Sequence, residues 1–218
     1  ASVSFDNVPK EKRVIIGWMS NWDYAQEVPT QAWRSSMTVA REVSLKKTND
    51  GYILKNIPVA QLKKYQGKST RKTIKVKAEN QLIEKSQIDL SKAVVDLDLK
   101  KMTAGKYTFA LKNALGEELT FGIDNTTKEL FVDRSKSGNT DFGNHFATAV
   151  SKAPLNKVYS NVKMKLVIDK TSIEIFFNDG EKVLTEIFFP NEHFSELYLS
   201  TDTKGSTLNI RGHQLNIK

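Results

Sequence analysis

The sequence contains no cysteine and only three histidines, which lie far apart at His145, His193 and His213. The absence of cysteine excludes disulfides, thiolate metal sites and cysteine nucleophiles. A zinc site would require three distant segments to bring these histidines together, so we expect no metal site.

Long apolar runs are also absent. Uncharged stretches such as Val14–Ile16 and Ile187–Phe189 are far shorter than the about 20 residues that a membrane-spanning helix needs. The first residues, Ala1–Asp6, have neither the basic start nor the apolar core of a signal peptide. We therefore expect no membrane span, and these residues leave the compartment open.

The charge is unbalanced, with 33 basic against 25 acidic residues and a formal net charge of +8. This excess would suit a nucleic-acid or anionic partner. However, the lysines alternate with apolar residues, as in Lys75–Lys77 and Lys163–Leu166, which is typical of the solvent-facing side of half-buried strands. We therefore expect solvated strand faces and no nucleic-acid partner.

Helical periodicity is scarce, and its best candidate is a short helix over Val59–Tyr65 after Pro58. Elsewhere apolar and polar residues alternate, as in Val95–Leu99 and Tyr107–Leu111, and turn residues such as Asp179-Gly180 separate the runs. About ten short strands without intervening helices predict an all-β fold, a sandwich of two antiparallel sheets. A closed barrel is the competing solution, because alternation does not show how a sheet ends.

The first 45 residues differ in character. Trp18, Trp22 and Trp33 lie within sixteen positions, with Tyr24 among them and with polar neighbours. Aromatic rings beside amides and charges suit a sugar, which has an apolar face and a rim of hydroxyls. A tryptophan-rich corner of the core explains the same spacing equally well.

Several segments of the chain resemble glycoside hydrolase family 32, which contains levanases, inulinases and invertases. The most specific is Gly17–Ala25 (Gly-Trp-Met-Ser-Asn-Trp-Asp-Tyr-Ala), continued by Val28–Thr30 and Trp33–Glu42. Two further segments are Glu129–Asn139 and Val167–Gly180. The resemblance implies a remnant of the last blade of a five-bladed catalytic propeller over 1–45, a linker with a short helix over 46–69, and a C-terminal β-sandwich over 70–218.

The resemblance also implies which parts of the enzyme are not in this sequence. The family's nucleophilic aspartate lies in a Trp-Met-Asn-Asp-Pro-Asn-like motif, a stabilising aspartate in Arg-Asp-Pro, and the acid/base glutamate in Glu-Cys; none of the three occurs in the 218 residues. Asp23 and Glu27 lie among the aromatic residues, and we interpret them as carboxylates of a turn or rim. We therefore expect no catalytic residue here, and a chain that by itself does not hydrolyse fructan.

By the same resemblance, the aromatic stretch lines a fructose pocket. Trp22 is the leading candidate for stacking on the sugar, with Asn21 beside it and Trp18 second. Trp33 is expected in the core. Arg34 is expected to pair with a carboxylate or with backbone carbonyls.

The sandwich has two candidate roles, structural support of the propeller and accessory sugar binding. Its polar loop Asp133–Asn139 has the composition to hold a hydroxylated ligand, but we expect a hairpin connection held by an Asp–Arg pair. The doublets Phe176-Phe177 and Phe188-Phe189 must each place one ring on either side of a strand, so one ring of each is available for an inter-domain contact.

The function that the resemblance implies is that of the C-terminal part of a β-fructosidase, which needs no cofactor, acts on levan, inulin or sucrose, and has an extracellular or periplasmic location. A free-standing, lectin-like sandwich module is the alternative. Because blade strands bury their faces against neighbouring blades, residues 1–40 are expected either to form a homodimer contact or to be an irregular arm.

Overall fold

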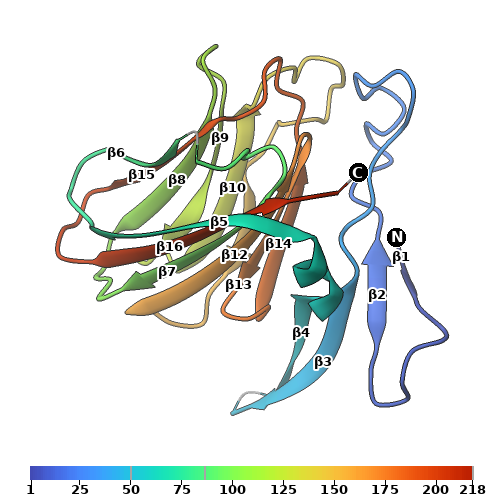
Figure 1. The fold of residues 1–218 in the computed structure, drawn as a ribbon, viewed down its shortest axis with the longest axis horizontal. Helices are drawn as coiled ribbons and strands as arrows, with labels where there is room; N and C mark the ends of the chain where they lie inside the picture. The colour runs from blue at the N-terminus through green and yellow to red at the C-terminus, as the bar shows by residue number, and fades with distance from the viewer. Residues whose placement is uncertain (50, 86, 218) are drawn as a thin grey trace.

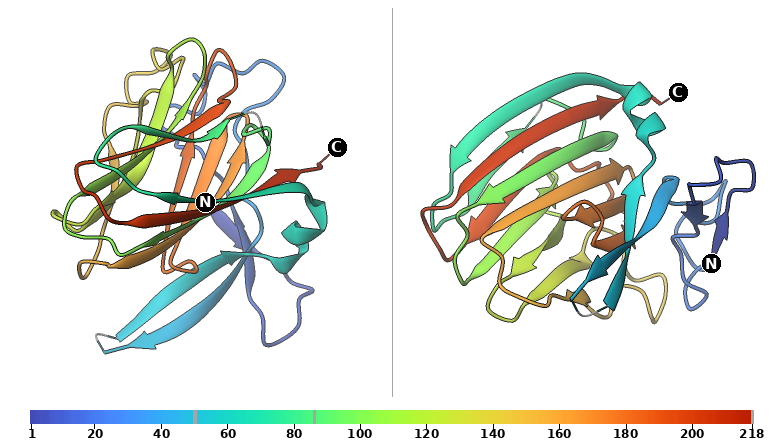
Figure 2. Two further views of the ribbon diagram at one scale, coloured as in Figure 1. Left: turned by 60° about the vertical axis from the view of Figure 1, so that its left-hand side comes forward. Right: turned by 90° about the horizontal axis from the view of Figure 1, so that it is seen from below.

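A computed structural model describes residues 1–49, 51–85 and 87–217, and in this part of the chain strands build three antiparallel sheets (Figure 1). Two sheets of six strands face each other as a sandwich, and a smaller sheet of four strands lies beside one end of it (Figure 2). The sandwich predicted from alternation is therefore confirmed. Each of its sheets ends in two edge strands, so the structure is not a closed barrel.

The two sheets of the sandwich are named here after a central strand of each. The β8 sheet has the order β11 (Ser151–Pro154), β10 (Glu129–Lys136), β9 (Glu118–Asp124), β8 (Lys106–Lys112), β15 (Glu196–Thr201) and β6 (Gln81–Lys85). The β7 sheet has the order β14 (Lys182–Ile187), β13 (Ser172–Phe177), β12 (Asn161–Asp169), β7 (Ala93–Lys100), β16 (Thr207–Leu215) and β5 (Gln66–Lys75).

The four-stranded sheet consists of the first strands of the chain. Its order is β1 (Ser2–Ser4), β2 (Val14–Gly17), β3 (Arg41–Thr48) and β4 (Gly51–Pro58). The 3-10 helix η1 (Ala60–Tyr65) follows Pro58 and leads into β5. The predicted short helix is thus present in the tighter 3-10 form, and the segment 46–69 expected as a linker contains β4 and the start of β5.

The core lies between the two sandwich sheets and follows from the period-two pattern. Inward residues of both sheets are almost fully buried, and Phe109 stacks on Phe121 with ring centroids 5.5 Å apart. Of the two phenylalanine doublets, Phe177 and Phe188 enter this core.

The other member of each doublet faces the N-terminal part of the chain. Phe176 packs with Val39 and Leu62, and Phe189 packs with Tyr24. The prediction that one ring of each doublet is available for an inter-domain contact is confirmed.

Hydrogen bonds also join the four-stranded sheet to the sandwich. The backbone N–H of Asn56 in β4 donates to the carbonyl of Gly180 at 3.0 Å, and Lys46 in β3 forms an ion pair with Glu181 at 2.5 Å. The sheet is therefore held against the β12–β14 edge of the sandwich.

No helix in the described ranges is long and apolar enough to cross a membrane. In the same ranges, no group of three or more histidine, aspartate and glutamate residues is arranged to hold a metal ion.

Candidate functional site

Residues 18–40, called the tryptophan loop below, connect β2 to β3. An isolated antiparallel bridge between Trp18 and Met37 closes its neck, and the Met19 N–H donates to the Ser36 carbonyl at 2.9 Å. The hydroxyl of Thr38 accepts a hydrogen bond from the Gly17 N–H at 3.0 Å. The ends of the loop are thereby fixed to the sheet.

Asn21 begins a tight turn at the tip of this loop. Its side-chain oxygen accepts from the Asp23 N–H at 3.1 Å, and its carbonyl accepts from the Tyr24 and Ala25 N–H groups at 3.2 and 2.8 Å. Such a local side-chain bond is the usual way in which asparagine stabilises a turn. Asn21 therefore shapes the turn, and no residue that the structure describes accepts a hydrogen bond from its amide group.

Trp22 projects from this turn into solvent, with 78% of its surface exposed. Its ring lies 5.0 Å from that of the half-buried Trp18 at an interplanar angle of 53°. The loop thus presents two indoles side by side, one supporting the other. Trp18 also lines a hollow of about 430 Å³ together with Ile15, Met19 and Arg41.

Two residues after Trp22, the buried Tyr24 anchors the turn on the sandwich. Its ring meets Phe146 edge-on at 5.1 Å, and Phe142 and Phe189 complete the cluster. Phe142 and Phe146 belong to the loop between β10 and β11, which lies beside the tryptophan loop (Figure 1). The position of Trp22 therefore depends on contacts that a sandwich loop provides.

Arg134 in β10 makes the polar contacts around the buried Tyr24. It donates to the carbonyl of Ile187 at 3.1 Å and forms an ion pair with the buried Glu186 at 3.1 Å. Its guanidinium lies over the Phe146 ring at 4.0 Å and donates to the Tyr24 hydroxyl at 3.4 Å.

The expected pairing of Arg134 with Asp133 is therefore wrong. Adjacent residues of a strand point to opposite sides, so the carboxylate of Asp133 instead accepts from the Ser135 N–H at 2.9 Å. Burial raises the pKa of Glu186, and the charge of Arg134 opposes that shift.

A second buried ion pair joins the end of the tryptophan loop to the sandwich. Glu174 in β13 accepts from the Val39 N–H at 2.7 Å and from the guanidinium of Arg41 at 2.5 and 3.0 Å. Burial raises the pKa of Glu174, while Arg41 acts in the opposite direction.

Sequence reasoning missed both of these pairs. A signal was available, because Glu174 shares a strand face with Phe176, one of the two rings of a doublet of which one was expected to be available for an inter-domain contact.

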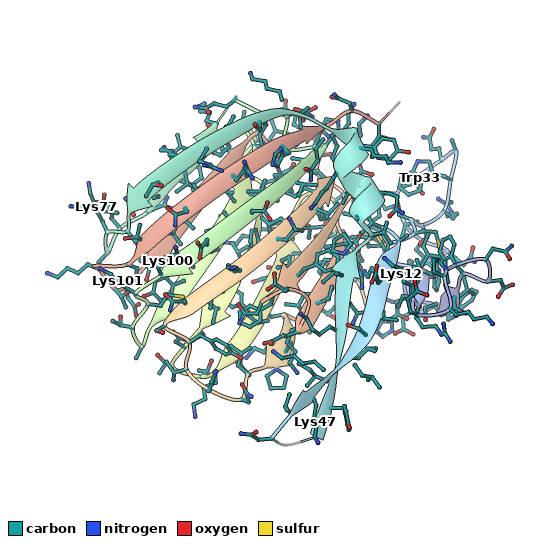
Figure 3. The ribbon with its side chains drawn as sticks, turned by 60° about the horizontal axis from the view of Figure 1, so that its bottom comes forward. Lys12, Trp33, Lys47, Lys77, Lys100 and Lys101 are labelled. Atoms are coloured by element: carbon teal, nitrogen blue, oxygen red, sulfur yellow. The ribbon has the colours of Figure 1, made fainter. Side chains whose placement is uncertain are left out.

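Trp33, labelled in Figure 3, is not a core residue, contrary to expectation, because 45% of its surface is exposed. The neighbouring residue Arg34 is bonded to the backbone of the same loop. It donates to the carbonyls of Val28 and Thr30 and holds them inside the loop, so its expected pairing with backbone carbonyls is confirmed.

The remaining polar groups of the loop are two carboxylates and two hydroxyls. Asp23 and Glu27 are exposed on the turn. The hydroxyls of Ser20 and Ser35 are buried and have no hydrogen-bond partner among the described residues. The arrangement can therefore place an aromatic surface, amide hydrogens and carboxylates around a polyhydroxylated molecule.

Two protein-family models match the chain, and together they cover nearly all of it. Residues 1–57 match the model described as "Glycosyl hydrolases family 32 N-terminal domain". Residues 59–214 match "Glycosyl hydrolases family 32 C terminal". The boundary between the matches falls at the end of β4, just before η1.

Similar sequences include the levanase of Bacillus subtilis, 34% identical over 204 residues, which are 91% of this chain and 30% of that protein. The extracellular exo-inulinase of Aspergillus niger is 28% identical over 226 residues, covering all of this chain and 41% of that protein. The chain thus spans less than half the length of these relatives.

Among solved structures, the exo-inulinase of Aspergillus awamori superposes with a TM-score of 0.83 at 27% identity, covering 98% of this chain and 42% of that one. The β-fructofuranosidase of Schwanniomyces occidentalis, complexed with fructosyl-erythritol, gives a TM-score of 0.81 at 21% identity and shares the fold, covering 99% of this chain and 47% of that one.

Proposed function

Because the chain belongs to glycoside hydrolase family 32, we propose that it is the C-terminal part of a β-fructosidase that hydrolyses levan, inulin or sucrose. The matched relatives are named as a levanase and exo-inulinases, and their names support a fructan as the substrate. The four-stranded sheet corresponds in this proposal to the last blade of the catalytic propeller.

By itself the 218-residue chain does not release fructose in this proposal. Hydrolysis with retention requires two carboxyl groups about 5–5.5 Å apart, one as nucleophile and one as proton donor. The family's three carboxylate motifs do not occur in the sequence. The buried Glu174 and Glu186 instead form ion pairs with arginines, so neither is free to act as a nucleophile or proton donor.

The chain's contribution to the reaction is a surface for the sugar. The exposed Trp22, supported by Trp18, covers the apolar face of a furanose and displaces water from it, and the amide of Asn21 donates to a hydroxyl. The single observation that carries this role is a 78% exposed indole on a turn that the sandwich holds in place.

Affinity electrophoresis in gels containing levan tests this role. We expect levan to retard the chain, and Trp22→Ala to abolish most of the retardation, because aromatic stacking contributes about 1 kcal/mol beyond burial of area. Trp33→Ala is the matched control, since it removes an exposed tryptophan from the same loop. Equal retardation of all three proteins would contradict the role of Trp22.

Fructose release tests the catalytic part of the proposal. The purified chain is incubated with levan, inulin and sucrose, and no release above the buffer blank is expected. Release that disappears in Asp23→Asn or Glu27→Gln would show that the chain has its own catalytic carboxylates.

The sandwich acts in this proposal as a brace for the tryptophan loop. The contacts of Arg134 with Tyr24 and of Glu174 with Val39 support this role over direct sugar binding. A lectin-like module that acts alone is the alternative, and levan binding that survives Trp22→Ala would favour it.

The chain also associates with a second copy through residues 1–40 in this proposal. β1 is an edge strand of the four-stranded sheet, and Val3 and Phe5 near it are 63% and 45% exposed. Unpaired edges with apolar side chains promote such pairing. Light scattering should therefore show a mass that rises with concentration, and Val3→Lys should reduce the rise; a constant monomer mass would refute the contact.

An extracellular or periplasmic location is part of the same proposal. It is supported by relatives that are named as extracellular exo-inulinases.

A further inference from the structure

The outer side of the β7 sheet has three rows of polar side chains across the strands β5, β16, β7 and β12. The row positions follow from the pairing registers, and on β16, β7 and β12 the residues that alternate with them enter the core. We call these rows the basic face: Arg71, Arg211, Asp96 and Lys165; Thr73, Asn209, Asp98 and Lys163; Lys75, Thr207, Lys100 and Asn161.

The basic face concentrates the positive charge of the chain. Its rows contain six basic and two acidic residues, a net charge of +4, against a formal net charge of +8 for all 218 residues. Figure 3 looks onto this side of the sheet, with Lys100 at the end of β7. The lysines and arginines that are dispersed in sequence are thus gathered by strand pairing.

Two arginines in the first row lie directly opposite each other. Arg71 of β5 pairs in register with Arg211 of β16, and both are exposed. Among the residues that the structure describes, neither guanidinium has a hydrogen-bond or salt-bridge partner. Like charges directly opposite each other in a sheet are destabilising, so this pair of arginines does not stabilise the fold.

The two carboxylates of the face form ion pairs with lysines of the same face. Asp96 forms an ion pair with Lys165, and Asp98 forms one with Lys100 at 3.2 Å. The amide of Asn209 also donates to Asp98 at 3.5 Å. The arginines therefore remain available to a negatively charged group from outside.

The surface is hollowed at this point. Arg71, Arg211, Thr73 and Asn209 line a hollow of about 350 Å³. Arg211 also lines a groove of about 710 Å³ between the β7 sheet and the β3–β4 hairpin, together with Lys163 and Lys165. The two concavities share Arg211, Asp96 and Asp98, so an extended chain fits along them.

We propose that the basic face binds an acidic polysaccharide, with Arg71 and Arg211 holding one of its carboxylate groups. The planar guanidinium matches a carboxylate through two parallel hydrogen bonds, and two such groups side by side complement a single negative charge. Asp96, Asp98 and Asn209 accept from and donate to the hydroxyls between the charged groups. This site is separate from the tryptophan loop and independent of the proposed hydrolysis.

The composition of the face argues for this ligand over a nucleic acid. Single-stranded nucleic acids are bound through aromatic side chains on which bases stack, and the three rows contain no aromatic residue. The two carboxylates of the face also offer acceptor oxygens, which match the hydroxyl groups that a sugar chain carries on every unit. A sugar chain with hydroxyls between its carboxylates matches both features.

Binding of the full chain to immobilised polygalacturonate tests the proposal. We expect binding at low salt that weakens as salt increases, and no comparable binding to dextran, which is neutral. The double variant Arg71→Ser/Arg211→Ser should raise the Kd about tenfold or more. Arg71→Lys/Arg211→Lys keeps the charge and should raise it only a few-fold, because the paired hydrogen bonds are lost.

The matched control is Lys47→Ser/Lys170→Ser, which removes two exposed cations that do not belong to the basic face. It should change the Kd less than twofold; an increase equal to that of the arginine variant would show non-specific attraction and overturn the site. Binding of the wild type to single-stranded DNA that is tighter and equally dependent on the two arginines would overturn the choice of ligand. No binding to polygalacturonate at low salt would also refute the proposal.

Loss of fold does not explain the expected result. Removing two facing cations relieves repulsion, so the Tm of Arg71→Ser/Arg211→Ser should be unchanged or higher. A lower Tm together with weaker binding would mean that the arginines support the sheet, which would overturn their role as ligands.

Discussion

Arg41 and Glu174 lie 133 residues apart in sequence and form a buried ion pair, with Nη2 and Nε of the arginine 2.5 and 3.0 Å from Oε2 of the glutamate. Arg41 begins β3 of the four-stranded sheet, and Glu174 lies in β13 of the sandwich. The other carboxylate oxygen accepts from the Val39 N–H at 2.7 Å. A single carboxylate thus fixes both the sheet and the end of the tryptophan loop to the sandwich.

Arg41→Ala should therefore be strongly destabilising. It leaves Glu174 buried without a compensating charge, which costs about 3–5 kcal/mol of the free energy of unfolding. Urea denaturation followed by circular dichroism measures this change. Lys12→Ala removes the exposed partner of Glu42 and should cost about 0.5 kcal/mol or less; equal effects of the two changes would contradict the importance of the buried pair.

Gly180 should not tolerate alanine, because its backbone contacts β4. It has φ +80°, and a Cβ there would lie 1.8 Å from the carbonyl oxygen of Asn56. We expect Gly180→Ala to destabilise the chain by about 2–4 kcal/mol, from overpacking added to backbone strain. Gly116 also has φ +80° but has no atom within 4 Å of a Cβ, so Gly116→Ala should cost only about 1 kcal/mol. Similar losses in thermal unfolding would mean that the contact with Asn56 does not matter.

Acid should destabilise the protein partly through Glu117. Partial burial raises the pKa of this carboxyl, but hydrogen bonds from Asn191 and Asn113 outweigh burial and lower it below the ordinary value of 4.5. Because the unfolded chain takes up this proton at a higher pH than the folded chain, stability from Glu117 is present above about pH 4.5 and is lost as pH falls through the lowered pKa.

Glu117→Gln should accordingly reduce the dependence of the unfolding free energy on pH below pH 4.5. Urea titrations at a series of acidic pH values measure this slope. Glu79→Gln, at an exposed residue whose partner is Lys77, is the control and should leave the slope unchanged. A wild-type slope in Glu117→Gln would show that the carboxyl does not contribute.

Arg134 and Glu186 should behave as one unit. Arg134→Met alone leaves the carboxylate of Glu186 buried without a charged partner and should lower the free energy of unfolding by about 3–5 kcal/mol. The double variant Arg134→Met/Glu186→Gln should recover most of that loss. Acrylamide quenching of tryptophan fluorescence gives a second readout, since release of Tyr24 should make the tryptophan loop more accessible. Additive effects of the two substitutions would contradict the coupling.

Alternation in the sequence was sufficient to predict the sandwich, because the side-chain period of a strand is two and one face of each sheet must be buried. Phe176-Phe177 shows how far this reasoning extends: adjacency alone requires the rings to face opposite ways, and both faces are occupied as expected. Trp33 shows its limit, since the loop has no period and aromatic content alone did not distinguish a core ring from an exposed one.

Local sequence was enough to predict the strands, the turns, the solvent-facing side of the lysines and the family to which the aromatic segment is similar. It did not reveal which distant residues meet, as Arg41 meets Glu174 and Arg71 faces Arg211. A strand's pattern fixes which side of it is buried, but the order and register of strands from distant parts of the chain depend on the packing of the whole core, which no local stretch of sequence encodes.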